Sequence, residues 1–181
     1  MMQHHNYLIN PLLASPSTGN WHSLAFLQWD IRRPPRRAAR VSGGAISNSH
    51  LSQPGIAPAV TSLRIISDLL YESWVLAAHN PTGVTVEDIL TVIHEQFHAP
   101  LTIPEWECMS QRERTRTEEV FYARCSASRN FGRTRNGGVR RVDCLLNTTT
   151  FAGLSSLVFR NNRWEIVLTL SRDFSARHRD A

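Results

Sequence analysis

The residues whose types and spacing could most directly support chemistry are His94, Glu95 and His98, which form the pattern His-Glu-x-x-His. Residues four apart on a helix lie on the same face, so the two histidines could hold one metal ion. Zinc peptidases bind their metal in this way and use the glutamate as a general base on a bound water. Glu118 or Glu119, further along the chain, is a candidate third ligand. The pattern therefore predicts a zinc-dependent hydrolase as one candidate function.

The residues around this pattern favour a helix edge without a metal. Ala99 and Pro100 follow His98 directly, and a proline at this position ends the helix. The helices of zinc peptidases continue past the second histidine. Both histidines also flank the apolar stripe of the helix instead of interrupting it, as residues at a surface edge do. We therefore expect no cofactor, and we keep zinc bound by His94, His98 and Glu118 as the alternative.

Three helices that must position these side chains each begin with a Ser or Thr followed, three positions later, by an acidic residue. This spacing forms a capping box, which satisfies free N–H groups at a helix start. The three pairs are Thr85 with Asp88, Thr102 with Glu105, and Ser110 with Glu113. Apolar residues recur at helical spacing after Thr85, which predicts a helix over residues 86–98. The second helix is short, and the third runs to about residue 127.

Several segments rich in β-branched and aromatic residues predict strands. They are residues 23–31, 62–67, 73–77, 155–160 and 164–170, and the last two form a hairpin around a turn at residues 161–163. Together with the helices, they predict an α+β fold. We expect a mostly antiparallel sheet of five or six strands, packed on one face by about three helices.

The densest pattern of the sequence lies in residues 137–154. Two glycines predict a turn, and residues 139–142 follow as a short strand. In a strand, Arg140 and Arg141 point to opposite faces, and Asp143 lies on the face of Arg141. We therefore expect an orienting salt bridge between Arg141 and Asp143, and a ligand-binding arginine is the alternative.

Several short sequence blocks of the chain resemble those of an uncharacterised domain-of-unknown-function family of basidiomycete fungi. The family has a Gly-Val-Arg-Arg-Val-Asp block and a Thr-x-Phe-x-Gly-Leu block, which match residues 138–143 and 149–154. Other blocks of the family are similar to residues 10–13, where Asn10 replaces a histidine, to residues 29–32 and to residues 84–90. The resemblance implies one intact domain in a fungal, intracellular setting. It assigns no activity, cofactor or site residue.

The ends of the chain and one internal segment differ in composition from the rest. Residues 1–20 predict an N-terminal arm anchored by Leu12 and Leu13, followed by one domain over residues 21–170 and a polar tail over residues 171–181. Residues 32–61 begin with Arg-Arg-Pro-Pro-Arg-Arg, and the paired prolines oppose regular structure. We expect this segment to be a mobile loop inserted in the domain.

All 20 basic residues of the chain are arginine. Residues 109–181 carry 14 Arg and seven acids, a net charge of +7, whereas residues 63–108 have a net charge of −6. Residues 126–138 predict a basic loop with one aromatic residue, Phe131. Its candidate anion-binding residues are Arg129, Arg133 and Arg135, because such loops can contact phosphates and stack a base.

Composition limits the class of protein. The chain has 181 residues, of which 41% are hydrophobic, so it is long enough to bury a core. Its three cysteines show no paired spacing, and it has neither a long apolar run nor a secretory signal. We therefore expect an intracellular protein, cytoplasmic or nuclear, that does not bind a membrane.

No other catalytic template is present, so we expect a non-catalytic module that binds an unknown protein partner. Trp29, Asp30, Arg140, Arg141 and Asp143 are its candidate structural or partner-binding residues. A zinc hydrolase with Glu95 as its general base and a nucleic-acid binder that uses the Arg-rich loops remain the alternatives.

Overall fold

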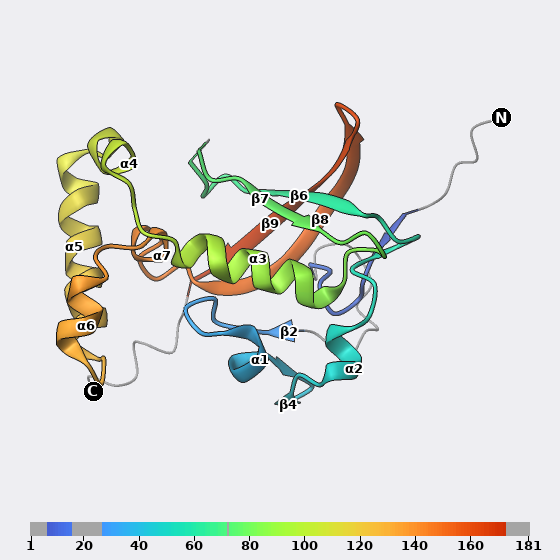
Figure 1. Cartoon of the computed structure of the whole chain (residues 1–181), viewed down its shortest axis with the longest axis horizontal. Coiled ribbons are helices and arrows are strands. Elements are labelled where there is room, and N and C mark those ends of the chain that lie inside the picture. Colours follow the sequence, from blue (N-terminus) through green and yellow to red (C-terminus); the bar gives the residue numbers. More distant parts are fainter. Residues whose placement is uncertain (1–6, 16–26, 72, 173–181) are drawn as a thin grey trace.

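The computed structural model describes residues 7–15, 27–71 and 73–172, and it confirms a mixed α+β fold (Figure 1). Its largest sheet has the strand order β7-β6-β9-β8, with β6 Ser62–Ile66, β7 Leu76–His79, β8 Thr150–Arg160 and β9 Arg163–Ser171. Strand β6 runs parallel to β9, and the other neighbours are antiparallel. The predicted β8–β9 hairpin is confirmed. The prediction of one sheet with five or six strands is wrong, because this sheet has four strands.

The remaining strands of the described part form two small sheets. Strand β1, Leu8–Ile9, pairs with β5, Ile56–Ala57. Strands β2 (Leu27–Gln28), β3 (Arg40–Val41) and β4 (Gly44–Ala45) form the other sheet. Each of these strands has two residues, so the alternation of apolar and polar side chains that marks a strand cannot show in the sequence.

Residues 32–61 contain short elements of regular structure where the sequence predicts a loop, and the mobility of this segment stays a prediction. Besides three short strands, they contain the helices α1, Pro35–Ala38, and α2, Asn48–Leu51. Pro34 is the N-cap of α1 and Pro35 is its first residue. The first turn of a helix has no hydrogen-bond partner for its N–H groups, so a proline there costs nothing.

The three predicted capping boxes are confirmed. They open α3 (Val86–His98), α4 (Ile103–Cys108) and α5 (Gln111–Ser126). At the start of α3, the backbone N–H of Asp88 donates to the Thr85 hydroxyl, 3.2 Å away, and the Asp88 carboxylate accepts from the Thr85 N–H at 2.9 Å. The helix ends at His98, before Pro100, as its sequence predicts.

Two further helices lie where the sequence predicts other structures. Helix α6, Phe131–Asn136, replaces part of the predicted loop over residues 126–138. Helix α7, Arg141–Cys144, replaces the predicted strand over residues 139–142. The Asp143 carboxylate accepts a hydrogen bond from the Arg140 N–H at 2.8 Å. This bond satisfies a free backbone donor at the helix start, which stabilises a helical turn over an extended chain.

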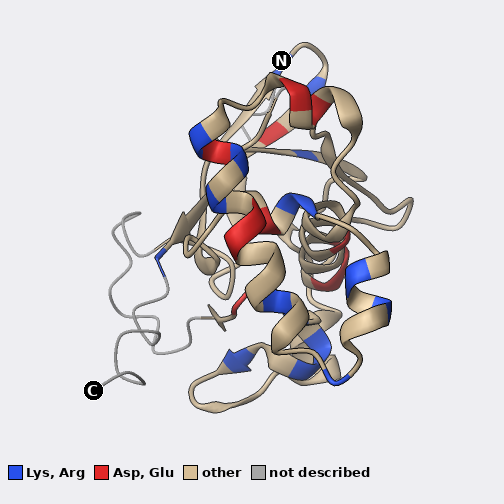
Figure 2. Cartoon of the chain, turned by 90° about the vertical axis from the view of Figure 1, so that its left-hand side faces the viewer, with Lys and Arg blue, Asp and Glu red and all other residues tan. Residues whose placement is uncertain are grey.

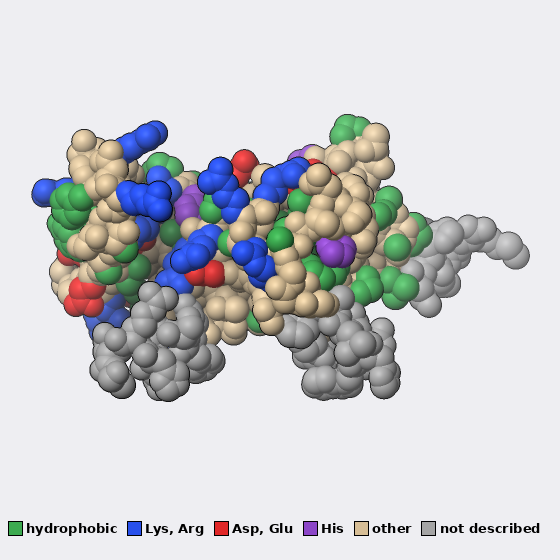
Figure 3. Space-filling model, turned by 90° about the horizontal axis from the view of Figure 1, so that it is seen from below, with side chains coloured by type: hydrophobic (Ala, Val, Ile, Leu, Met, Phe, Trp, Pro, Cys, Tyr) green, Lys and Arg blue, Asp and Glu red, His purple; other side chains and the backbone are tan. Residues whose placement is uncertain are grey.

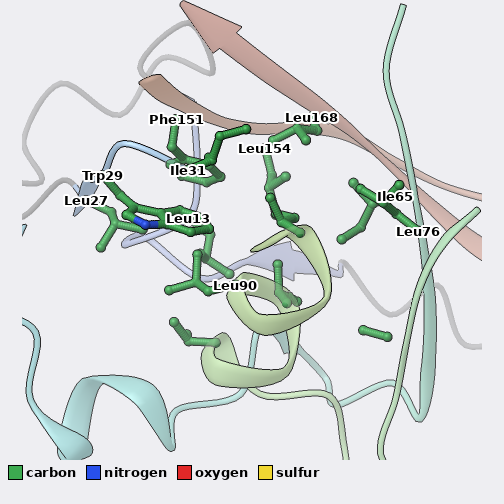
Figure 4. Close-up of a cluster of buried hydrophobic side chains, with 14 of the residues drawn as sticks. Leu13, Leu27, Trp29, Ile31, Ile65, Leu76, Leu90, Phe151, Leu154 and Leu168 are labelled. Carbon is green, nitrogen blue, oxygen red and sulfur yellow. The ribbon is translucent and has the colours of Figure 1, made fainter. Parts of the chain in front are cut away.

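The core lies between α3 and the four-stranded sheet (Figures 1 and 4). In Figure 4, Leu13 and Trp29 from the N-terminal segments lie near Leu90 of α3 and Leu154 of β8. Leu13 is completely buried, which confirms its predicted role as an anchor. Residues 1–6 and 16–20 of the predicted arm and nearly all of the predicted tail fall outside the described residues. Within the described part, no helix has both the length and the apolar character needed to cross a membrane.

Candidate functional site

The two histidines at the end of α3 share one backbone oxygen. His94 Nδ1 lies 3.1 Å from the carbonyl oxygen of Ile31, and His98 Nε2 lies 3.3 Å from the same atom. Their ring centroids are 4.1 Å apart. A carbonyl oxygen can only accept hydrogen bonds, so both facing ring nitrogens carry a proton. The histidines therefore attach the segment that contains Ile31 to the last turn of α3.

The second nitrogen of His98 is also engaged. Its Nδ1 lies 3.2 Å from the Arg140 guanidinium, which can only donate. This contact requires a neutral His98 that carries its proton on Nε2. Burial, together with the neighbouring His94 and Arg140, lowers the pKa of His98 to about 4, which agrees with the neutral form.

The residues of the zinc hypothesis do not converge on one point. His94 and His98 are half-buried against Ile31, whereas Glu95 is exposed and Glu118 is exposed on a different helix, α5. In the described residues, no three or more His, Cys, Asp and Glu side chains are grouped to hold a metal ion. To bind zinc, His98 would have to give up one of its two contacts, because both of its ring nitrogens are engaged. Metal analysis of the protein beside a His94→Ala/His98→Ala variant tests the zinc prediction directly.

Asp143 binds Arg124, not Arg141, so the predicted pairing is wrong. The Arg124 Nε and NH2 groups donate to the two Asp143 carboxylate oxygens, each at 2.8 Å. Arg124 also donates to the Gly138 carbonyl at 3.0 Å. Asp143 is 1% exposed, so this bidentate pair holds α5, α7 and the turn before α7 together.

Arg141 instead pairs with Glu105 of α4, at 2.9 Å. It also donates to the Gln96 side chain at 3.2 Å, and its guanidinium lies 5.2 Å from the centre of the Trp74 ring. Burial alone would raise the pKa of Glu105. Hydrogen bonds from Thr102 and the charge of Arg141 outweigh it and lower the pKa to about 2. The pair is therefore ionised, and it links α3, α4 and α7.

Trp29 and Asp30 serve the packing of the same region. The Trp29 ring is 2% exposed, lies 6.5 Å from the His94 ring, and donates from its indole nitrogen to the Arg33 carbonyl at 2.8 Å. Asp30 forms a surface ion pair with Arg32. The ring contact of Trp29 with His94, like the contacts of Arg140, Arg141 and Asp143, holds elements of the domain together, whereas the Asp30 ion pair joins residues two apart.

The candidate anion-binding residues lie on the surface. Arg129, Arg133 and Arg135 are exposed and have no ion pair within the described residues. The same holds for Arg33 and Arg37, at α1. We call these five residues the arginine face. Figure 3 shows arginine side chains gathered on the side of the molecule that carries α1 and at the neighbouring end, where α5 and α6 lie.

The model of a family of unknown function matches residues 27–164, about three quarters of the chain. The chain belongs to DUF6699. No curated protein and no solved structure matches it. The DUF6699 region contains all the candidate site residues, and it leaves out β1 and nearly all of β9.

The sequence does not predict the contacts of three residues that organise this part of the DUF6699 region. Ile31 contributes a backbone oxygen, which leaves no signal in a side-chain pattern. Arg124 lies 19 residues from Asp143, so the pair leaves no local pattern; the only signal is its helical spacing of three from buried Phe121. Glu105 was recognised only as a capping residue, although it also binds Arg141.

Proposed function

We propose that this protein is a non-catalytic, intracellular interaction module that binds an acidic segment of a partner protein through the arginine face. The observation that carries the proposal is the arginine face, whose five residues are exposed and form no ion pair in the described part of the chain; Arg112, Arg116, Arg160 and Arg172 are exposed and unpaired as well. Cytoplasmic or nuclear localisation belongs to the same proposal.

Some arginines of the described part do have a carboxylate partner, which shows how this side chain is satisfied when an acid is within reach. Arg36 pairs with Glu87, Arg124 with Asp143, and Arg141 with Glu105. Guanidinium groups bind carboxylates through two parallel hydrogen bonds, and neighbouring unpaired guanidinium groups repel one another. An acidic segment would supply the missing carboxylates and relieve this repulsion.

The distribution of charge favours a peptide over a nucleic acid. Helix α5 exposes Glu118 and Glu119 beside the arginine-bearing α6. Figure 2 shows these acidic residues in the middle of α5, with basic residues on both sides along the helix. A continuous phosphate backbone places a negative charge at every nucleotide and would meet these carboxylates. A peptide can place its acidic residues only opposite arginines.

Fluorescence anisotropy with a labelled peptide of Glu, Asp and Ser tests the proposal. We expect binding that weakens as salt rises, and about tenfold weaker binding by an Arg133→Gln/Arg135→Gln variant. An Arg160→Gln/Arg163→Gln variant loses the same charge from exposed arginines at the β8–β9 turn, away from this face, and should bind like the wild type. Absence of binding at low salt, or equal losses in both variants, would contradict the proposal.

A labelled uridine oligonucleotide of equal charge provides the comparison with nucleic acid. We expect it to bind more weakly than the peptide, because of Glu118 and Glu119. Tighter binding of the oligonucleotide, lost in the Arg133→Gln/Arg135→Gln variant, would replace the protein partner with a nucleic acid.

A further inference from the structure

Helix α6 is built with its apolar residue outside and a polar residue inside. Phe131, its first residue, is 47% exposed, whereas Thr134 is half-buried. The Thr134 hydroxyl donates to the Ser128 hydroxyl at 2.7 Å, just after the end of α5. Surface helices usually turn their apolar side chains toward the protein. In α6 this orientation is reversed.

The reversed orientation is held by specific contacts. The Asn130 side chain caps α6 by accepting from the Arg133 N–H at 2.9 Å, and α6 packs against α5. The bond between Thr134 and Ser128 fixes which side of the helix faces inward. The exposure of Phe131 therefore follows from an ordered helix.

Phe131 also differs from the other two exposed aromatic residues of the described part. Tyr122 packs on Phe121, with ring centroids 5.2 Å apart, and Phe159 packs on Trp164 at 5.1 Å. No ring contact involves Phe131 within the described residues. Its neighbours on the surface are arginines instead. Arg135 lies four residues later, on the same side of α6, and Arg129 precedes the helix.

An exposed ring beside unpaired guanidinium groups suits a ligand with two chemical parts. A carboxylate can bind Arg135 while an adjacent aromatic or large aliphatic side chain covers the Phe131 ring. A second aromatic ring would gain an offset or edge contact with Phe131 and a cation–π contact with a neighbouring arginine. A purely acidic peptide would leave the Phe131 ring in water.

We infer that the acidic segment bound by the arginine face carries an aromatic or large aliphatic residue that packs on Phe131. This inference rests on the proposed function, because the carboxylates of the segment are what bring it to this face. It adds a hydrophobic determinant to a recognition that would otherwise depend on charge alone.

The test compares two labelled peptides of equal length and charge, one made of Glu, Asp and Ser and the other with a single central Ser replaced by Phe. We expect the wild type to bind the Phe-containing peptide about fivefold more tightly. Phe131→Ala should abolish this preference and leave the affinity for the plain peptide unchanged. Ile103→Ala removes another exposed apolar side chain, 74% exposed on α4, and should keep the preference. Urea unfolding checks that both variants remain folded.

The outcomes separate the two proposals. Equal affinity of the wild type for both peptides would overturn the role of Phe131 and leave the acidic partner in place. If Phe131→Ala keeps the preference for the Phe-containing peptide, the role of Phe131 is likewise overturned and the acidic partner stays in place. If neither peptide binds at low salt, the proposed function fails. If the uridine oligonucleotide alone binds, and Phe131→Ala weakens it, Phe131 stacks a base and the acidic peptide is the wrong ligand.

Discussion

The carbonyl oxygen of Ile31 explains why two half-buried histidines lie side by side at the end of α3. Each ring donates to this oxygen, although Ile31 lies 63 residues before His94. The sequence identifies the histidines as a chemical pair because their spacing is local. Their partner is a backbone atom far away in the chain, so no local pattern could predict the contact. The sequence predicts the residues of this site better than it predicts their role.

Protonation of His98 should destabilise the fold at acidic pH. Burial, His94 and Arg140 lower the pKa of His98 to about 4 in the folded state, from 6.5. As pH falls through 6.5, the unfolded chain binds a proton that the folded chain does not bind until about pH 4, so stability is lost over this range. Because the ring is partly exposed and screened by solvent, we expect a loss of about 1 kcal/mol.

Urea unfolding at about pH 7 and about pH 5 measures this loss. His98→Gln keeps a donor for Ile31 and cannot titrate, so its stability should fall less between the two pH values. His79→Gln, at an exposed histidine, should follow the wild type. If His98→Gln loses as much stability as the wild type, His98 does not contribute to the pH dependence.

Asp143→Asn should be strongly destabilising. The change leaves the Arg124 side chain, which is 23% exposed, without its bidentate carboxylate. Removing one partner of a buried ion pair costs about 3 kcal/mol, because the other charge remains unpaired. Asp30→Asn disrupts an exposed pair with Arg32 and should cost less than about 1 kcal/mol. Similar urea midpoints for the two variants would show that the Arg124–Asp143 pair contributes little.

At the scale of helices and strands, the sequence predicts the long elements that begin with a capping box and misses the short ones. Helix α3 has a capping box and 13 residues of apolar periodicity, so its start and its end were both predictable. Helices α1 and α7 have four residues each, which is little more than one turn. A single turn shows no periodicity, and the valines on either side of Arg140 and Arg141 favour a strand locally. The local bond from the Arg140 N–H to Asp143 and the tertiary ion pair of Asp143 with Arg124 stabilise α7 as a helix.

Gly153→Ala should disrupt the contact between β8 and the N-terminal segment. Gly153 has φ +111°, and a Cβ atom there would lie 2.5 Å from the Ser15 Cα atom. The Ser15 N–H donates to the Leu154 carbonyl at 2.8 Å, so the segment cannot move away without breaking this bond. We expect a destabilisation of at least about 2 kcal/mol, measured by urea unfolding.

Gly44→Ala is the matched control, since a Cβ atom at Gly44 would meet only the Val41 carbonyl at 3.6 Å, an ordinary contact. It should change the unfolding free energy by less than about 1 kcal/mol. A Gly153→Ala variant as stable as Gly44→Ala would mean that the N-terminal segment does not pack closely on β8.

At the scale of the whole molecule, the folded unit extends beyond the region that matches the family. Residues 27–164 leave out Leu12 and Leu13, which are 7% and 0% exposed. They also leave out all of β9 after Trp164. Strand β9 lies between β6 and β8 and forms hydrogen bonds with both, so it is an interior strand of the largest sheet. Its residues Ile166, Leu168 and Leu170 are buried.

A chain shortened to residues 27–164 should therefore not fold. Without β9, strands β6 and β8 each lose their shared partner, and buried backbone groups that lose a hydrogen bond are costly. Each buried aliphatic side chain that is removed also costs about 2–5 kcal/mol, so the loss of several exceeds the stability of a typical domain. We expect residues 7–172 to show a cooperative urea transition and dispersed amide resonances, and residues 27–164 to show neither. A cooperative transition in the shorter chain would mean that α3 and the remaining strands form a sufficient core without the N-terminal anchor and β9.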